Sequence, residues 1–388
     1  MDNKFIPLCI PSIGALEAAK VQECMLSTFV SSVGKLVTEF EEKFAEYVGS
    51  KYAVACSSGT AAIHLALLGL GLKAKSNIVV PNFTFIASVN PVAYIKGDPI
   101  FLDAEPFTFN PDTRYLNILL HEVPKHEDVA MPDAFLGVHL YGMPMDLDEV
   151  IDTLNKNSIP LIEDATESLG AKWNSGPLAG KYVGTVGKVG CFSFNGNKII
   201  TSGGGGMVVT DDEELAMRIR HLSTQARDSK TEYSHDQVGY NYRMTNLHAS
   251  LGLAQLERLP EILERKKEIA EKYTEAFKKT RGIMFQRTPQ GKDVSSSNWM
   301  YTIVADPESL GVRSRDIIRH LAIKNIQSRP LWTPISTLPM YENATYFSKN
   351  NQDISSFLYQ HGLNLPCSYD LTDKEQDRVI KTILEFIE

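Results

Sequence analysis

Lys198 is the side chain most suited to covalent chemistry in this sequence, because it stands in a polar turn between two apolar segments. Residues 191–193 read as the end of a buried strand, and the glycines at 203–206 lead into a second strand. A lysine held at such a turn loses contact with water, which disfavours its charged form and frees the amine as a nucleophile. Schiff-base formation with a carbonyl, above all that of pyridoxal phosphate (PLP), needs such an amine. On this segment alone, an exposed lysine in a glycine-rich hairpin is an equal alternative.

The segment 57–62, Ser-Ser-Gly-Thr-Ala-Ala, lies where a short strand ends and a helix begins. Free N–H groups at a helix start form an anion site suited to phosphate, with Gly59 allowing close approach and Thr60 adding a hydroxyl. Ser193 lies five residues before Lys198, near enough for its hydroxyl to share that phosphate. The alternative is an ordinary Ser or Thr helix cap without a ligand.

Asp164 follows an apolar strand over 159–163, at the carboxyl end where open α/β sheets collect their ligands. There it could pair with a protonated pyridine nitrogen. The Asp-x-x-Glu spacing of Asp164 and Glu167 is also close to a helix capping box, so a structural role stays open. Phe85 follows the end of another strand and could stack on a flat ring, although core packing is the usual fate of a phenylalanine.

The elements that must position these side chains alternate between short apolar strands and helices. This alternation over about 200 residues predicts an α/β domain with a mainly parallel sheet. A helix is expected over 84–94, whereas 106–131 reads as irregular. A long helix over 247–279 leads into a second domain. We therefore expect a large domain over 1–250 and a smaller α/β domain over 251–388.

Composition excludes several classes of function. The chain has 388 residues and a formal net charge of -8 without a sustained basic stretch, so nucleic acid is not an expected partner. No apolar run reaches the ~18 residues that span a bilayer, and the N-terminus lacks the features of a signal peptide. Five scattered cysteines without a C-x-x-C pair predict neither a disulfide framework nor a metal site, and they fit a reducing cytoplasm.

Taken in order, these segments resemble the DegT/DnrJ/EryC1/StrS family of PLP-dependent sugar aminotransferases, which have the fold type I architecture of aspartate aminotransferase. The match runs from Pro7 to the C-terminus. Its motifs are Ser58-Gly-Thr60, Pro81-Asn-Phe-Thr-Phe85, Tyr141-Gly-Met-Pro144, Glu163-Asp-Ala165, Phe192-Ser-Phe194 with Lys198, and Gly239-Tyr-Asn-Tyr-Arg-Met244. The resemblance implies a large PLP-binding domain followed by a smaller one.

The resemblance also implies how the cofactor is held. Lys198 forms the covalent link to PLP, and Asp164 binds its pyridine nitrogen. The other contacts come from separate motifs: Gly59, Thr60 and Ser193 at the phosphate, Phe85 on the ring, Glu167 beside the ring oxygen, and Asn241 reaching the phosphate from a partner subunit. A homodimer with shared active sites is therefore expected. At Glu167 the family commonly has His or Gln, and at Ser336 many members have a substrate-side histidine, so contacts there do not transfer.

The segments 29–35, 163–170 and 329–332 look most like enzymes of the bacillosamine and legionaminic acid pathways. The resemblance then implies that L-glutamate gives its amino group to the cofactor, leaving pyridoxamine phosphate, and that C4 of a UDP-linked 2-acetamido-4-keto-6-deoxy sugar takes it up. Arg329 and Trp332 are the candidates for substrate contacts.

Three other functions are alternatives to this interpretation. A perosamine synthase acting on GDP-4-keto-6-deoxymannose is the first alternative. A related sugar dehydratase that uses pyridoxamine phosphate is the second, and Lys198 counts against it because such enzymes look to have His there. A non-catalytic regulator is the third, and it predicts a broken lysine or aspartate motif or a basic helix-turn-helix.

Overall fold

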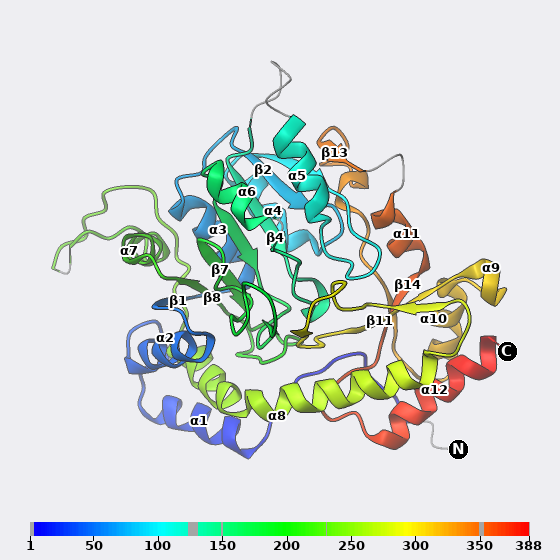
Figure 1. Ribbon diagram of the computed structural model, residues 1–388. Helices are drawn as coiled ribbons and strands as arrows, with labels where there is room; N and C mark the ends of the chain where they lie inside the picture. Colours follow the sequence, from blue (N-terminus) through cyan, green and yellow to red (C-terminus); the bar gives the residue numbers. More distant parts are fainter. Residues whose placement is uncertain (1–3, 123–130, 149, 230, 349–352, 388) are drawn as a thin grey trace.

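The computed structural model describes residues 4–122, 131–148, 150–229, 231–348 and 353–387, and an eight-stranded sheet forms its centre (Figure 1). In spatial order its strands are β1 (Tyr52–Cys56), β8 (Gly206–Thr210), β7 (Val189–Ser193), β5 (Leu161–Asp164), β4 (Ala134–Val138), β2 (Asn77–Pro81), β3 (Asp98–Leu102) and β13 (Thr345–Phe347). β8 runs antiparallel to β1 and β7, and the other recorded pairs are parallel. The expected mainly parallel α/β sheet is confirmed.

Helices cover this sheet. All five residues of β4 are buried, and successive side chains of a strand point to opposite faces, so both faces of the sheet are covered. The helices are α1 (Ala15–Leu26), α2 (Lys35–Val48), α3 (Gly59–Gly69), α4 (Asn90–Tyr94), α5 (Thr113–Glu122), α6 (Ile151–Lys156), α7 (Glu213–Ser223), α8 (Asn246–Phe277), α9 (Pro307–Leu310), α10 (Ser314–Ile323), α11 (Ile354–His361) and α12 (Asp373–Ile387). Among the described residues, none of these helices has the length and apolar character that a membrane crossing requires.

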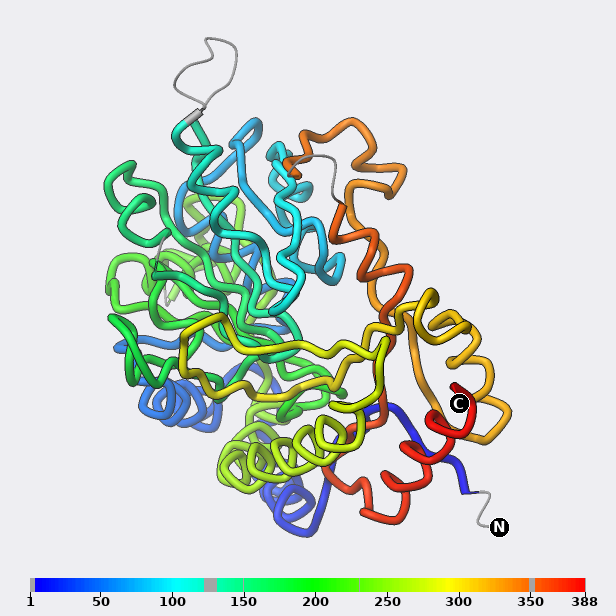
Figure 2. The backbone as a smooth tube through the Cα atoms, turned by 45° about the vertical axis from the view of Figure 1, so that its right-hand side comes forward, coloured from blue at the N-terminus to red at the C-terminus, as the bar shows by residue number. Residues whose placement is uncertain are grey.

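A second sheet is built from strands that follow the long helix α8 in the sequence, in the part of the chain coloured yellow to red in Figure 2. Its strands in spatial order are β12 (Arg329–Pro330), β14 (Gly362–Leu365), β11 (Tyr301–Ala305) and β9 (Ile283–Phe285), and a separate pair is formed by β10 (Val294–Ser295) and β6 (Lys172–Trp173). α8 spans the expected domain boundary at residue 250, and β13 returns to the edge of the large sheet. The division into 1–250 and 251–388 stays a prediction.

Two expectations about local structure were wrong. The helix expected over 84–94 is divided into a short 3₁₀ turn, η1 (Ile86–Ser88), and α4, in which Pro91 stands in the first turn. The stretch 106–131 contains α5, although 123–130 lie outside the described residues. α5 buries Leu116, Leu119 and Leu120, whose spacing of three and four residues is that of one helix face.

The turn that carries Lys198 joins β7 to β8, as the sequence predicts. The two strands pair antiparallel, with Ser193 opposite Gly206. Two backbone hydrogen bonds connect the two sides of the turn at its base: Phe194 N–H donates to the Gly205 carbonyl (2.9 Å), and Ser202 N–H donates to the Phe194 carbonyl (2.9 Å). The ring of Phe194 is fully buried, so the base of the turn is anchored in the core and Lys198 has a fixed position.

Candidate active site

A cavity of about 920 Å³ lies at the carboxyl end of β5, and its wall also contains residues of the C-terminal part of the chain, among them Trp299, residues 329–333 and Asn364. The large sheet and the C-terminal sheet therefore both contribute to its wall. The wall contains nine of the residues selected from the sequence: Gly59, Thr60, Phe85, Asp164, Glu167, Ser193, Lys198, Arg329 and Trp332. These residues come from at least four separate segments of the chain, and folding brings them to one place.

Lys198 lies inside the cavity with a side chain that is only 12% exposed. Its Nζ is 4.1 Å from the centre of the Trp299 ring and 3.9 Å from Glu167 Oε1. Burial lowers the pKa of Lys198, and the nearby carboxylates of Glu167 and Asp164 only partly oppose this. The exposed-lysine alternative is therefore wrong, and the amine has the environment that nucleophilic chemistry requires.

Glu167 is the buried acid next to this amine. Burial raises its pKa to about 7, although the charge of Lys198 acts in the opposite direction. Its Oε2 accepts a hydrogen bond from the N–H of Tyr141 (2.8 Å), a residue whose φ of 55° lies in the left-handed region. The raised pKa of Glu167 and the lowered pKa of Lys198 both favour the neutral forms of the two groups.

Asp164 ends β5 with its carboxylate in the cavity wall and only 1% exposed. Oδ1 accepts the N–H of Thr166 (3.0 Å), and Oδ2 accepts the hydroxyl of Ser88 (2.7 Å). No helix follows Asp164, so the capping-box alternative is wrong. Among the described ion pairs Asp164 has no cationic partner, which leaves a buried carboxylate suited to a cationic ring nitrogen of a ligand.

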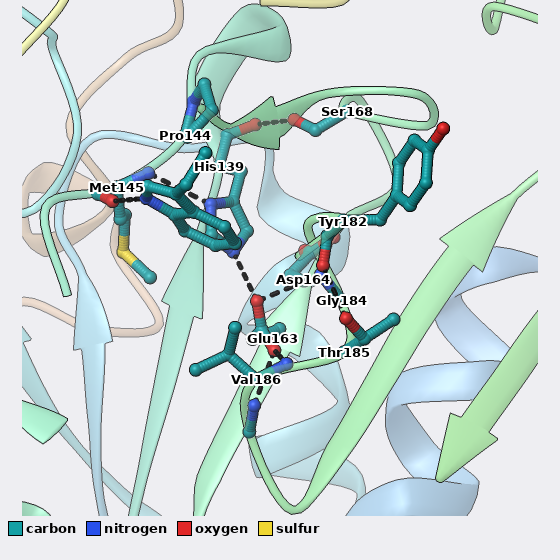
Figure 3. Close-up of polar contacts among 12 residues, drawn as sticks. His139, Pro144, Met145, Glu163, Asp164, Ser168, Tyr182, Gly184, Thr185 and Val186 are labelled. Atoms are coloured by element: carbon teal, nitrogen blue, oxygen red, sulfur yellow. Dashed lines mark hydrogen bonds and ion pairs between the residues drawn. The ribbon is translucent and has the colours of Figure 1, made fainter. Parts of the chain in front are cut away.

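Glu163, the neighbour of Asp164, points to the opposite face of β5 (Figure 3). Its hydrogen bonds on that face stabilise the end of the strand. Its Oε2 accepts hydrogen bonds from His139 Nε2 (3.0 Å) and Gly184 N–H (2.9 Å). Its Oε1 accepts the N–H groups of Val186 (2.7 Å) and Gly187 (2.6 Å). Burial alone would raise its pKa, but these donors outweigh burial and the pKa of Glu163 is lowered. The sequence motif includes Glu163, but sequence reasoning assigned it no role.

The tautomer of His139 follows from its partners. Nδ1 accepts the N–H of Met145 (3.0 Å), so Nε2 carries the proton that is donated to Glu163 (Figure 3). The backbone N–H of His139 donates to the carbonyl of Asp164 (3.1 Å), and Ser168 donates to the carbonyl of His139. This buried network fixes the end of β5 and thereby the position of Asp164.

The predicted phosphate segment forms the start of α3. Ser58 caps the helix by accepting the N–H of Ala61 (3.0 Å), and Ala62 N–H donates to the Ser58 carbonyl. The N–H groups of Gly59 and Thr60 have no acceptor among the described hydrogen bonds, so the helix start keeps donors for an anion. A Cβ at Gly59 would lie 2.7 Å from Ser193 Cβ, which shows that the two predicted phosphate contacts adjoin. The helix cap is therefore present, and it leaves the predicted anion site its donors.

Aromatic side chains form another part of the wall, and sequence reasoning found only some of them. Phe85 is 49% exposed, so the core-packing alternative is wrong, and its ring centre is 5.9 Å from that of Trp332. Trp332 stacks on Tyr141 at 4.6 Å, and Trp299 stacks on Tyr141 at 6.2 Å. The chain has three tryptophans, and two of them lie in this cavity. The small number of tryptophans was the one feature of the sequence that could have drawn attention to Trp299 as a site residue.

Asn241 is the one selected residue that is not part of the cavity wall. It is exposed and forms an isolated bridge with Thr224, and exposed apolar side chains such as Val238 (79%) and Val33 (72%) occur in nearby segments. Folding of one chain therefore does not bring Asn241 to the other site residues.

Comparisons with known proteins agree with this geometry. The model of the DegT/DnrJ/EryC1/StrS aminotransferase family matches residues 11–384. EpsN of Bacillus subtilis is 39% identical over 98% of this chain and 96% of its own, and GDP-perosamine synthase of Escherichia coli O157:H7 is 38% identical over 99% of both. Spr1654 from Streptococcus pneumoniae, solved in its PMP form, has a TM-score of 0.87 at 26% identity, covering 99% of this chain and 100% of that one.

Proposed function

This chain belongs to the DegT/DnrJ/EryC1/StrS aminotransferase family, and we propose that it transfers the amino group of L-glutamate to C4 of a UDP-linked 2-acetamido-4-keto-6-deoxy sugar. It is a PLP-dependent sugar aminotransferase of nucleotide-sugar pathways. The observation that carries the proposal is one cavity with a buried lysine, a buried aspartate that forms no ion pair among the described residues, and a helix start whose first N–H groups have no acceptor there.

The donor set of the cavity fits PLP. Gly59, Thr60 and Ser193 offer N–H and hydroxyl donors to the phosphate, and Asp164 offers a buried carboxylate to the pyridine nitrogen. Phe85 offers an exposed ring face. When bound, PLP supplies an aldehyde and an electron-withdrawing ring that stabilises negative charge on the carbon next to nitrogen.

The residues of the chain then move protons. Lys198 Nζ accepts a proton from the donor carbon and can return it, because its lowered pKa favours the neutral amine that acts as a base. Glu167 Oε1 lies 3.9 Å from Lys198 Nζ, and its raised pKa favours the protonated carboxyl. A buried carboxylate at Asp164 keeps the ring nitrogen protonated.

The sugar nucleotide enters beside the aromatic wall. Trp332 and Trp299 present stacked rings on which the apolar face of a hexose can pack. Arg329 is exposed on β12 at the cavity, where its guanidinium can bind a carboxylate or a diphosphate with two parallel hydrogen bonds.

A panel of nucleotide-linked keto sugars with glutamate as donor tests the substrate. We expect mass spectrometry to show amination of the UDP-linked 2-acetamido-4-keto-6-deoxy sugar. The second candidate is GDP-4-keto-6-deoxymannose, which the similarity to a GDP-perosamine synthase favours. Turnover confined to the GDP sugar would contradict our proposal for the sugar while leaving the aminotransferase activity intact.

We also propose that Asn241 completes the phosphate site of a partner subunit in a homodimer, because it lies outside the cavity of its own chain. Two variants that we expect to be inactive on their own, Lys198→Ala and Asn241→Asp, test this when they are co-expressed with different tags. If the sites are shared, each mixed dimer has one site with both defects and one intact site, so it recovers about half of the wild-type activity. If Asn241 acts within its own chain, every site in the mixed dimer has one defect and activity is not recovered.

A further inference from the structure

Two cysteines and a buried lysine meet behind the Lys198 turn. Lys266 Nζ, on α8, lies 3.7 Å from Cys9 Sγ and 3.8 Å from Cys367 Sγ. The two chain segments that carry the thiols run side by side, since the N–H of Cys367 donates to the carbonyl of Leu8 (2.8 Å). Cys367 Sγ also lies 3.5 Å from the carbonyl oxygen of Trp299. We call Cys9, Lys266 and Cys367 the thiol cluster.

The surroundings of Lys266 require an anion. Lys266 is only 4% exposed, and its other partners are two uncharged carbonyl oxygens, those of Trp299 (3.0 Å) and Cys367 (2.6 Å). None of the ion pairs among the described residues includes Lys266, and its recorded charge interactions are with Cys9 and Cys367. A buried ammonium is stable when it is paired, so one of these thiols serves as its counter-ion.

The two thiols divide the roles of thiolate and thiol. The neighbouring thiol of Cys367 is the main cause that lowers the pKa of Cys9 to about 6, and the charge of Lys266 adds to it. The neighbouring Cys9 and burial raise the pKa of Cys367. Of the two thiols, Cys9 therefore has the greater thiolate character. Cys367 keeps its proton.

Cys9 is also the thiol that small molecules can reach. It is partly exposed and lies in the wall of the active-site cavity, whereas Cys24, Cys56, Cys191 and Cys367 are buried. Burial is the main cause that raises the pKa of Cys24, Cys56 and Cys191. A reagent that enters the cavity therefore meets the sulfur of Cys9, and the sulfur of Cys367 lies near the same Lys266 amine.

We propose that Cys9 and Cys367 are an oxidation site, at which a hydroperoxide converts the two thiols into a disulfide next to the catalytic turn. The Cys9 thiolate attacks one oxygen of hydrogen peroxide, which gives a sulfenic acid and releases hydroxide. The sulfur of Cys367 then attacks the Cys9 sulfur and displaces its oxygen, and the thiol proton of Cys367 ends in water. Two thiols lose two electrons, and one peroxide becomes two waters.

Oxidation of the thiol cluster can change the position of Lys198, because two contacts connect the cluster to this residue. Cys9 Sγ lies 3.6 Å from the carbonyl oxygen of Asn197, and the indole N–H of Trp299 donates to the same carbonyl (2.6 Å). Asn197 precedes Lys198, and the Trp299 ring lies 4.1 Å from Lys198 Nζ. A disulfide removes the counter-ion of Lys266 and the contact between Cys9 and Asn197, so we expect turnover to fall until the disulfide is reduced.

The test treats the PLP-loaded enzyme with hydrogen peroxide, blocks free thiols by alkylation, and maps peptides by mass spectrometry. We expect a linked peptide pair containing Cys9 and Cys367, a loss of two hydrogen masses from the intact chain, and reversal of both by dithiothreitol. Activity, measured relative to each untreated variant, should fall and recover in parallel. The mass readout needs no substrate, so it is independent of the proposed function.

Matched variants make the result decisive. Cys9→Ser and Cys367→Ser should each abolish the linked peptide, and Cys24→Ser should leave it unchanged because Cys24 is buried and has no second thiol among its recorded partners. The proposal is overturned if Cys9 remains fully alkylatable after peroxide treatment. It is also overturned if Cys9 is oxidised to sulfinic acid while Cys367 stays free.

Discussion

Replacing Lys198 with alanine abolishes transamination, with an expected loss of turnover of about 10³-fold or more. The variant loses both the nucleophile and the group that moves the proton, and no other amine in the described part of the cavity wall replaces it. The fold should survive. Without the charge of Lys198, the pKa of Glu167 rises further and its carboxyl becomes neutral, so no unpaired charge is left buried.

Three measurements check this expectation. The variant should lack the visible absorbance of covalently bound PLP, and borohydride reduction followed by peptide mapping should modify position 198 in the wild type only. Lys198→Arg is the matched variant, because it keeps a cation but not an amine nucleophile, and it should be equally inactive. Lys181→Ala, at an exposed lysine, should retain activity. A Lys198→Ala variant with turnover within tenfold of wild type would falsify the assignment.

Glu163→Gln should destabilise the protein by about 3 kcal/mol or more, because a buried hydrogen-bonded anion is replaced by a group that cannot satisfy its donors. Both carboxylate oxygens accept two donors, so the amide nitrogen of glutamine faces N–H groups in either orientation. His139 cannot relieve the conflict by changing tautomer, since its Nδ1 already accepts the N–H of Met145.

Urea unfolding monitored by circular dichroism measures the loss, and Glu42→Gln is the control. Glu42 is exposed on α2, so its substitution should change the free energy of unfolding by no more than ~0.5 kcal/mol. Because the pKa of Glu163 is lowered in the folded state, its stabilisation is fully present above the ordinary value of 4.5 and is lost as the pH falls further. The difference between wild type and Glu163→Gln should therefore shrink below that pH. A difference below 1 kcal/mol at pH 7 would show that the network is not needed for stability.

Much of the site could be predicted because the family motifs are local. Gly59, Thr60, Ser193 and Lys198 each stand at a strand end or a turn that the sequence pattern marks. Phe85 and Asp164 were also found, but the choice between ligand contact and core packing or capping needed the fold. The exposure of the Phe85 side chain excluded core packing. The absence of a helix directly after Asp164 excluded the capping box.

The sequence by itself determined the α/β class, the strand–turn–strand that carries Lys198, and the residue types for a PLP site, because these depend on patterns within short segments. Only the tertiary structure decided which residues from distant parts of the sequence contact each other. Glu163 and Asp164 are adjacent in the chain, yet the alternation of a strand sends one into a buried network with His139 and the other into the cavity. Trp299 and the thiol cluster depend on contacts between residues that are a hundred or more positions apart, and no local pattern records such contacts.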